Sequence, residues 1–198
     1  DLIAGAARAV DPGLTIEHAG DGFAAGLLVA RFRPHVVFLD ARVAGMDAHD
    51  SAQLLKHTNL LLLNREEACT FTRSATAEES LQKLIKAGAR NVCITDGRRG
   101  VTASDGRHIY RCPVLKDVRV IDTTGAGDAF GAAATWALLT DRSLQTALIS
   151  GTLNAANVVS LIGAQTGLLT ENLMKEKHGG LGLHKLARYY YFPGVLEP

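Results

Sequence analysis

The sequence has little net charge, few cysteines and no long apolar run, and each shortage excludes a class of protein. Its 198 residues include 21 Lys and Arg against 20 Asp and Glu, a net charge of +1. Charge therefore gives no reason to expect binding to nucleic acid or to an anionic membrane. No apolar run reaches the length of a membrane span, and no signal-peptide pattern opens the chain. We expect a cytoplasmic protein with neither nucleic acid nor membrane as a partner.

The three cysteines and seven histidines show no pattern typical of a disulfide scaffold or a metal centre. Cys69, Cys93 and Cys112 are odd in number and lack metal-ligand spacing, which predicts reduced thiols. The histidines form no HxxxH-type pair, so the sequence gives little support for zinc. The remaining composition, 47% hydrophobic and 21% charged, is that of an ordinary globular protein.

The most informative stretch is the glycine-rich string Asp122-Thr-Thr-Gly-Ala-Gly-Asp128. It lies between the β-branched segment Val118 to Ile121 and an Ala-rich segment, which predicts a strand, a turn and a helix. Gly125 and Gly127 allow a ligand to approach the backbone closely, and the start of a helix favours an anion such as phosphate. Asp128 adds a carboxylate, which either takes the proton of an attacking hydroxyl or only caps the helix.

This string resembles the signature of the ribokinase-like (PfkB) carbohydrate kinases. The resemblance implies ATP-dependent phosphoryl transfer to a hydroxyl of a sugar or related small alcohol, with ATP and Mg²⁺ as cofactors. It implies that Asp128 is the catalytic base. It also implies that the backbone amides of Gly125, Ala126 and Gly127 stabilise charge on the transferring phosphoryl group.

Two further segments resemble motifs of the same family in the same order. The string Asn64-Arg-Glu-Glu67 is similar to the family's Asn-x-x-Glu motif. That resemblance implies that Asn64 and Glu67 organise Mg²⁺ through its waters, in keeping with the preference of hard cations for oxygen; the alternative is a solvated helix start. The string Thr95-Asp-Gly-Arg-Arg-Gly100 is similar to the nucleotide loop Thr-x-Gly-x-x-Gly. By that resemblance Thr95, Gly97 and Gly100 line the ATP site, although alone the string is an ordinary turn.

Two later segments resemble the family's adenine-side helix and the turn after it. They run from Asn154 to Val159 and from Gly163 to Gly167. The resemblance makes Asn154 and Asn157 candidates for contact with the nucleotide base. Helix capping or hydrogen bonding in the core is the alternative for each asparagine.

The first 50 residues predict four short elements in the order helix, strand, helix, strand. These are Leu2–Val10, Leu14–His18, Phe23–Phe32 and His35–Asp40. Such an alternation with short connections favours right-handed crossovers in a parallel sheet.

Parts of this region resemble the middle of a response-regulator receiver domain. The strings that carry the resemblance are Ala19–Ala25, Arg33–Asp40 and Gly45–Asp47. By that resemblance Asp40 occupies the phosphoacceptor position, although the receiver's first acidic strand would precede residue 1. The alternatives are a buried strand end, or the kinase family's own strand that ends in Asp.

Together these observations predict an α/β fold with three layers, a mostly parallel sheet and helices on both faces. We expect a ribokinase-like core with flavodoxin-like N-terminal units in a single domain. A chimera would consist of a receiver-like segment at 1–50, a nucleotide-binding and catalytic segment at 51–176, and a tail at 177–198. The tail matches neither family. We expect it to dock on the rest of the chain, to form a contact in a homo-oligomer or to remain unpacked.

Within the kinase-like segment, a capping box from Thr76 to Glu79 predicts a helix that ends at Gly88. Another helix is predicted from Leu144 to Leu161. The strands predicted from apolar and β-branched runs are 59–64, 92–95, 101–104, 107–111 and 118–121.

No segment resembles the family's sugar-binding portion or the lid over its substrate. The leading hypothesis is therefore an ATP-dependent carbohydrate kinase whose acceptor-binding half has no counterpart in this sequence. One alternative is a folded chimera or nucleotide-binding domain without catalysis. The other is a receiver-type signalling module that is phosphorylated on Asp40.

Overall fold

The computed structural model describes residues 13, 15–20, 24, 27–28, 31–33, 55–141, 143–180 and 188–191. The chain divides into two compact units, Asp1–His57 and Thr58–Pro198, where the sequence predicts one domain. In the first unit, residues 24, 27, 28, 31 and 32 are helical, in agreement with the helix predicted at Phe23–Phe32. The strand predicted at Leu14–His18 is wrong, because residues 15–18 are not in a strand and no described strand pairs with them. The predicted strand His35–Asp40 lies outside the described residues.

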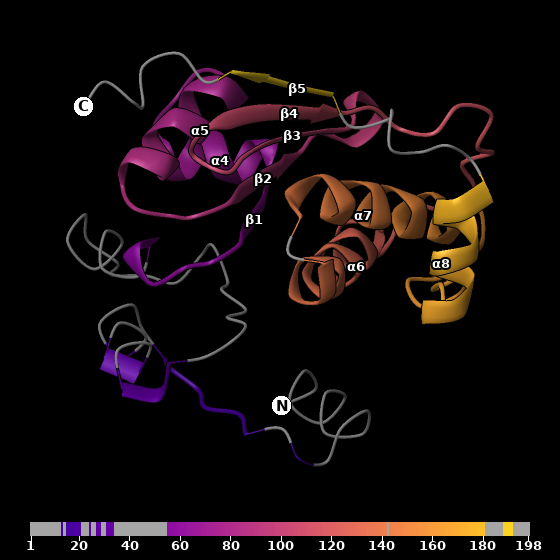
Figure 1. The fold of residues 1–198 in the computed structure, drawn as a ribbon, viewed down its shortest axis with the longest axis horizontal. Helices are drawn as coiled ribbons and strands as arrows, with labels where there is room; N and C mark the ends of the chain where they lie inside the picture. The colour runs from indigo at the N-terminus through magenta and orange to yellow at the C-terminus, as the bar shows by residue number, and fades with distance from the viewer. Residues whose placement is uncertain are drawn as a thin grey trace. The chain divides into compact units, whose positions relative to one another are not determined.

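The second unit contains a five-stranded sheet in the order β1-β2-β3-β4-β5 (Figure 1). The strands are β1 Leu61–Asn64, β2 Val92–Thr95, β3 Val101–Ser104, β4 His108–Cys112 and β5 Arg188–Tyr191. Only β1 and β2 run parallel, whereas the other three described pairs are antiparallel. The prediction of a mostly parallel sheet is therefore wrong for the described strands. The reason is chain connection: two helices cross over between β1 and β2, but short turns join β2 to β3 and β3 to β4.

Helices cover both faces of this sheet (Figure 1). On one face lie α4 Arg65–Thr72 and α5 Ala77–Lys86, and on the other lie α6 Ala126–Asp141 and α7 Leu144–Val158, while α8 Glu171–Gly180 packs against α7. Cys93 belongs to the buried cluster that α6 and α7 build, and side chains alternate along a strand. Val92 and Ile94 are fully buried on the opposite side, where α5 packs on β2. None of the helices within the described residues has the length and apolar character needed to cross a membrane.

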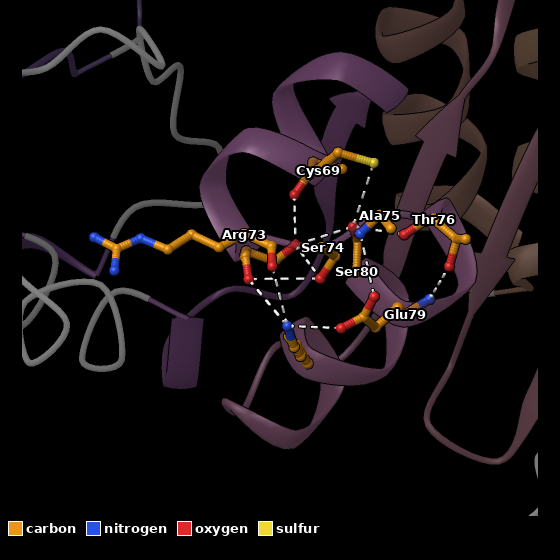
Figure 2. Close-up of polar contacts among 10 residues, drawn as sticks. Cys69, Arg73, Ser74, Ala75, Thr76, Glu79 and Ser80 are labelled. Carbon is orange, nitrogen blue, oxygen red and sulfur yellow. Dashed lines mark hydrogen bonds and ion pairs between the residues drawn. The ribbon is translucent and has the colours of Figure 1, made fainter.

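The corner between α4 and α5 shows how local polar groups start a helix (Figure 2). Thr76 is the N-cap of α5, and its hydroxyl accepts a hydrogen bond from the Glu79 amide at 3.1 Å. The Glu79 carboxylate accepts from the Ala75 amide instead of the Thr76 amide, so the predicted capping box is only half formed. The rest of the helix agrees with the prediction: one face is buried, and Gly88 follows its end with φ 114°.

The segment before the glycine-rich string differs from the prediction. Val118 to Ile121 is not a strand, because the amides of Ile121 and Asp122 donate to the carbonyl of Val159 at 2.8 and 3.2 Å. These backbone groups are therefore bonded to the end of α7 and not to a neighbouring strand. In the tail, β5 pairs with β4, which agrees with the docked-tail alternative for residues 188–191.

Candidate functional site

The ends of β1 and β2 bring two of the predicted motifs together. The two strands are parallel, and their register places Asn64 beside Thr95. The Thr95 hydroxyl donates to the Leu63 carbonyl at 3.5 Å. Ligands of open α/β sheets bind at the carboxyl ends of parallel strands, so this edge is a candidate phosphate and metal site.

Asn64 and Glu67 form a capping box at the start of α4. The Asn64 side chain accepts from the Glu67 amide, and the Glu67 carboxylate accepts from the Asn64 amide, both at 2.8 Å. One Glu67 oxygen is used by this bond, and the other has no hydrogen-bond partner among the described residues. A carboxylate oxygen fixed in direction suits a hard cation that keeps its waters. The motif is therefore a helix cap, and its role in holding Mg²⁺ stays a prediction.

An ion-pair cluster that was not predicted lies at the same edge. Asp96 accepts two hydrogen bonds from Arg99, at 2.6 and 2.8 Å, and Arg65 lies 3.8 Å from the same carboxylate. The bidentate bonds from Arg99 hold the pKa of Asp96 below its ordinary value. The cluster connects the first residue of α4 to the loop after β2. Its only signal in the sequence is Asp and Arg three residues apart.

The loop after β2 contains a short 3-10 helix at Gly97–Arg99. Gly97 has φ +50° and open space where a side chain would begin. Gly100 has φ +87° and packs against the Cys112 carbonyl so closely that a Cβ would collide with it. The two predicted nucleotide-loop glycines therefore differ: Gly100 is required by the fold, whereas the fold alone does not require Gly97.

The glycine-rich turn, residues 122–127, leads into the first turn of α6. Gly125 has φ +76°, and a Cβ there would lie 2.7 Å from Ala164. The Ala126 amide donates to the Thr123 carbonyl at 3.2 Å. The amides of Gly127 and Asp128 have no acceptor within the described part of the chain. Donors without an acceptor at a helix start are suited to an anion, and anion binding at this turn stays a prediction.

Asp128 lies in this first turn with an exposed side chain. Further along α6, a Cβ at Gly131 would lie 3.3 Å from the Leu62 side chain. α6 thus touches β1 three residues after Asp128 and two residues before Asn64. This contact relates the glycine-rich turn to the β1–β2 edge, although no hydrogen bond within the described residues joins Asp128 to Asn64 or Glu67.

Asp122 connects the glycine-rich turn to the segment that follows α7. Its carboxylate accepts from the amides of Thr124 at 2.9 Å and Gly163 at 3.0 Å. The bonds from Thr124 and Gly163 hold the pKa of Asp122 below its ordinary value. The turn and the segment are therefore connected through an ionised carboxylate.

This lowered pKa predicts how stability depends on pH. Because the folded state favours the ionised form of Asp122, the stabilisation is present at neutral pH and is lost as pH falls below about 3.9. The difference in Tm between the wild type and Asp122→Asn should be constant from pH 7 to 5 and should shrink towards pH 3. Thermal unfolding followed by circular dichroism measures it. A difference that persists unchanged at pH 3 would contradict the role of the charge.

Both candidate base-contacting asparagines have protein partners. Asn154 is 4% exposed, donates to the Ala129 carbonyl and accepts from the Leu169 amide, both at 2.8 Å. Asn157 donates to the Gly167 carbonyl at 2.7 Å. The bonds of Asn154 favour the alternative of core hydrogen bonding. Asn157 is half-buried and remains a prediction for the base side.

Comparison with known proteins decides the family. Residues 35–171 match the pfkB family carbohydrate kinase, which is more than half of the chain. The chain belongs to the pfkB family of carbohydrate kinases. Its fold is accordingly the α/β fold of ribokinase-like proteins.

Individual relatives of this pfkB chain agree with the assignment. It is 34% identical to a ribokinase of Bacillus subtilis (strain 168) over 124 residues, which are 63% of this chain and 41% of that protein. The ribokinase structure from Thermotoga maritima gives a TM-score of 0.65 at 26% identity, over 77% of this chain and 52% of that one. The Arabidopsis thaliana ribokinase complexed with ribose and ATP gives a TM-score of 0.57 at 25% identity, over 63% of this chain and 42% of that one. The pfkB chain therefore spans about half or less of the length of these relatives.

The pfkB match begins at residue 35, inside the segment that resembles a receiver domain. It includes His35–Asp40 and Gly45–Asp47, so it extends beyond the kinase boundary predicted at residue 51. For His35–Asp40 the match favours the alternative that these residues correspond to the kinase family's own strand ending in Asp. Neither the fold nor the relatives support a receiver segment or a chimera. Asp40 itself lies outside the described residues.

Proposed function

We propose that this chain carries the nucleotide-binding and phosphoryl-transfer part of an ATP-dependent kinase for a hydroxyl of a sugar or nucleoside. The observation that carries the proposal is Asp128 in the first turn of α6, beside the amides of Gly127 and Asp128, which have no acceptor among the residues that the structure describes. Membership of the pfkB family and the relative solved with ribose and ATP support the substrate class.

In this role the Asp128 carboxylate accepts the proton of the substrate hydroxyl. The hydroxyl oxygen forms a bond to the γ-phosphorus of ATP as the bond from that phosphorus to ADP breaks. The amides at the helix start stabilise negative charge on the transferring group. With Ala126 bonded to Thr123, the available donors are the amides of Gly127 and Asp128, with Gly125 as the third candidate.

The β1–β2 edge supplies the second half of the proposed site. Mg²⁺, when bound, would neutralise charge on the phosphates, and the free Glu67 oxygen with Asn64 would hold its waters. Thr95, Gly97 and Gly100 would line the nucleotide. A Cβ at Gly131 of α6 would lie 3.3 Å from the Leu62 side chain of β1, and this close approach supports treating the two halves as one site.

The test of this proposal is acceptor-dependent release of ADP. The chain would be incubated with Mg-ATP and a panel of sugars and nucleosides, with the phosphate ester identified by phosphorus NMR. We expect ADP release that depends on at least one acceptor. Saturable binding of Mg-ATP with no acceptor-dependent release would contradict the kinase proposal and favour the non-catalytic nucleotide-binding alternative.

Glu67 offers a separate test of the metal role, because its two functions respond to different substitutions. Glu67→Gln keeps an oxygen for the capping box but removes the charge that attracts a cation. We expect the Tm of Glu67→Gln to match the wild type, while the Mg²⁺ concentration for half-maximal binding of nucleotide rises about 10-fold or more.

Glu67→Ala is the matched control, because it removes the charge together with the bond between the carboxylate and the Asn64 amide, while the Asn64 side chain still caps the amide of residue 67. Losing that hydrogen bond should cost about 1 kcal/mol of stability, and the variant should show the same loss of Mg²⁺ dependence as Glu67→Gln. If Glu67→Gln keeps the wild-type Mg²⁺ dependence, the carboxylate acts only as a helix cap.

A further inference from the structure

Asn154 joins two parts of the candidate site through one buried side chain. It lies in α7 and is 4% exposed. Its amide nitrogen donates to the Ala129 carbonyl in the first turn of α6, and its oxygen accepts from the Leu169 amide. A carbonyl at one end and an N–H at the other fix the orientation of the side-chain amide.

The contact with α6 lies immediately after the proposed catalytic base. Ala129 follows Asp128, and its own amide donates to the Gly125 carbonyl at 2.8 Å. One turn earlier in α7, a Cβ at Gly151 would lie 2.6 Å from the Phe130 ring. α7 therefore fixes the first turn of α6 by close packing and by one hydrogen bond.

The other end of Asn154 holds the segment after α7, residues 160–169. This 160–169 segment also meets the glycine-rich turn directly, through the Asp122 bond to the Gly163 amide and the close approach of Gly125 to Ala164. Asn154 thus bonds both the first turn of α6 and the 160–169 segment. A shift of either part would change the hydrogen bonds of this one side-chain amide.

We propose that Asn154 is a positioning residue that sets the Asp128 turn of α6 relative to the 160–169 segment. This inference rests on the proposed kinase function for its effect on rate, but its structural part does not. Asn154 touches no substrate and acts through Ala129. It is buried and has both ends bonded, which favours the core hydrogen-bonding alternative for this asparagine.

The structural part is tested by hydrogen–deuterium exchange with mass spectrometry on the full chain. In Asn154→Ala we expect exchange to accelerate at least 10-fold in peptides that contain residues 125–130 and in those that contain residues 165–170. Thr152→Ala is the control, because Thr152 is a buried α7 residue whose hydroxyl contacts the Cys112 thiol and has no hydrogen bond to α6 within the described residues. Equal acceleration of residues 125–130 in both variants would overturn the proposal.

A conservative substitution adds a readout that a general loss of stability would not give. Asn154→Asp keeps the acceptor for Leu169, but its ionised form cannot donate to Ala129. Its protonated form can donate, and burial favours that form. Relative to the wild type at each pH, exchange protection of residues 125–130 in Asn154→Asp should recover as pH falls from 8 to 6. No recovery, with the variant folded, would contradict the donor role.

The effect on rate separates this inference from the proposed function. If the wild type turns over, Asn154→Ala should lower kcat by about 10- to 100-fold through misplacement of the base, with KM for ATP changed by less than about threefold. An unchanged kcat would overturn the positioning role. A wild type that shows no turnover would refute the proposed function, while the exchange measurements would still decide the structural inference.

Discussion

Asp128→Asn is expected to lower kcat by about 10²- to 10⁴-fold, the usual contribution of a general base. Asn has the same shape but cannot accept the proton of the attacking hydroxyl. Asp128 is exposed and its side chain has no hydrogen-bond partner among the described residues. The substitution should therefore leave the fold intact, and Tm is the check on that point.

The same variant should bind Mg-ADP with nearly wild-type affinity, because the free backbone amides of the turn do not depend on the side chain. Turnover and calorimetric titration, measured on one preparation, separate the two effects. Full activity in Asp128→Asn would remove Asp128 from the role of base. Loss of nucleotide binding together with turnover would instead assign it to phosphate or metal binding.

Gly100→Ala is expected to have the largest effect on stability. The backbone at Gly100 has φ 87° and ψ −139°, a region that L-residues rarely adopt, and the added methyl group would collide with the Cys112 carbonyl of β4. Backbone strain and overpacking together cost about 2–6 kcal/mol. Because proteins are stable by about 5–15 kcal/mol, chemical denaturation should show a large loss or an unfolded chain.

Gly97→Ala is the matched control in the same loop. Its φ of +50° is accessible to other residues at a cost of about 1–2 kcal/mol, and nothing lies within 4 Å of the new methyl group. A small loss of stability with a large loss of Mg-ADP affinity would show that the loop lies against the nucleotide. If Gly97→Ala and Gly100→Ala lose stability equally, the steric account of Gly100 is incorrect.

The sequence predicted those elements whose determinants are local. The helix after Thr76 has an N-cap residue, one apolar face and a terminal glycine. Each of these features can be recognised from a short stretch of the sequence. β2 and β3 are short β-branched runs, and their ends agree with the prediction. The glycine-rich turn and the helix after it were also predictable, because φ > 0 and helix starts have specific residue preferences.

Features that depend on distant partners could not be predicted. The short turns before and after β3 make it antiparallel to both of its neighbours. The residues of one strand do not determine that direction. Val118 to Ile121 has strand-like composition, but the Val159 carbonyl takes its backbone bonds. The sequence left both a nucleotide contact and core hydrogen bonding open for Asn154, and the bonds to Ala129 and Leu169 that favour the core alternative come from elements distant in the chain.

The Asn64–Glu67 pair shows a third reason why the sequence did not predict the whole site. Its residue types and spacing fit a metal motif and a capping box equally well, because both need a carboxylate three residues after a polar side chain. The structure forms the cap, and one Glu67 oxygen has no hydrogen-bond partner in the described part of the chain. Sequence alone could not show that the two roles are compatible.

The glycine-rich turn and the β1–β2 edge are proposed to form one nucleotide site. The first measurement to make is calorimetric titration of the purified, folded chain with Mg-ADP and Mg-ATP. We predict saturable binding that Gly97→Ala and Glu67→Gln weaken and that removal of Mg²⁺ reduces. Absence of binding at millimolar nucleotide, in a chain shown to be folded, would contradict the claim.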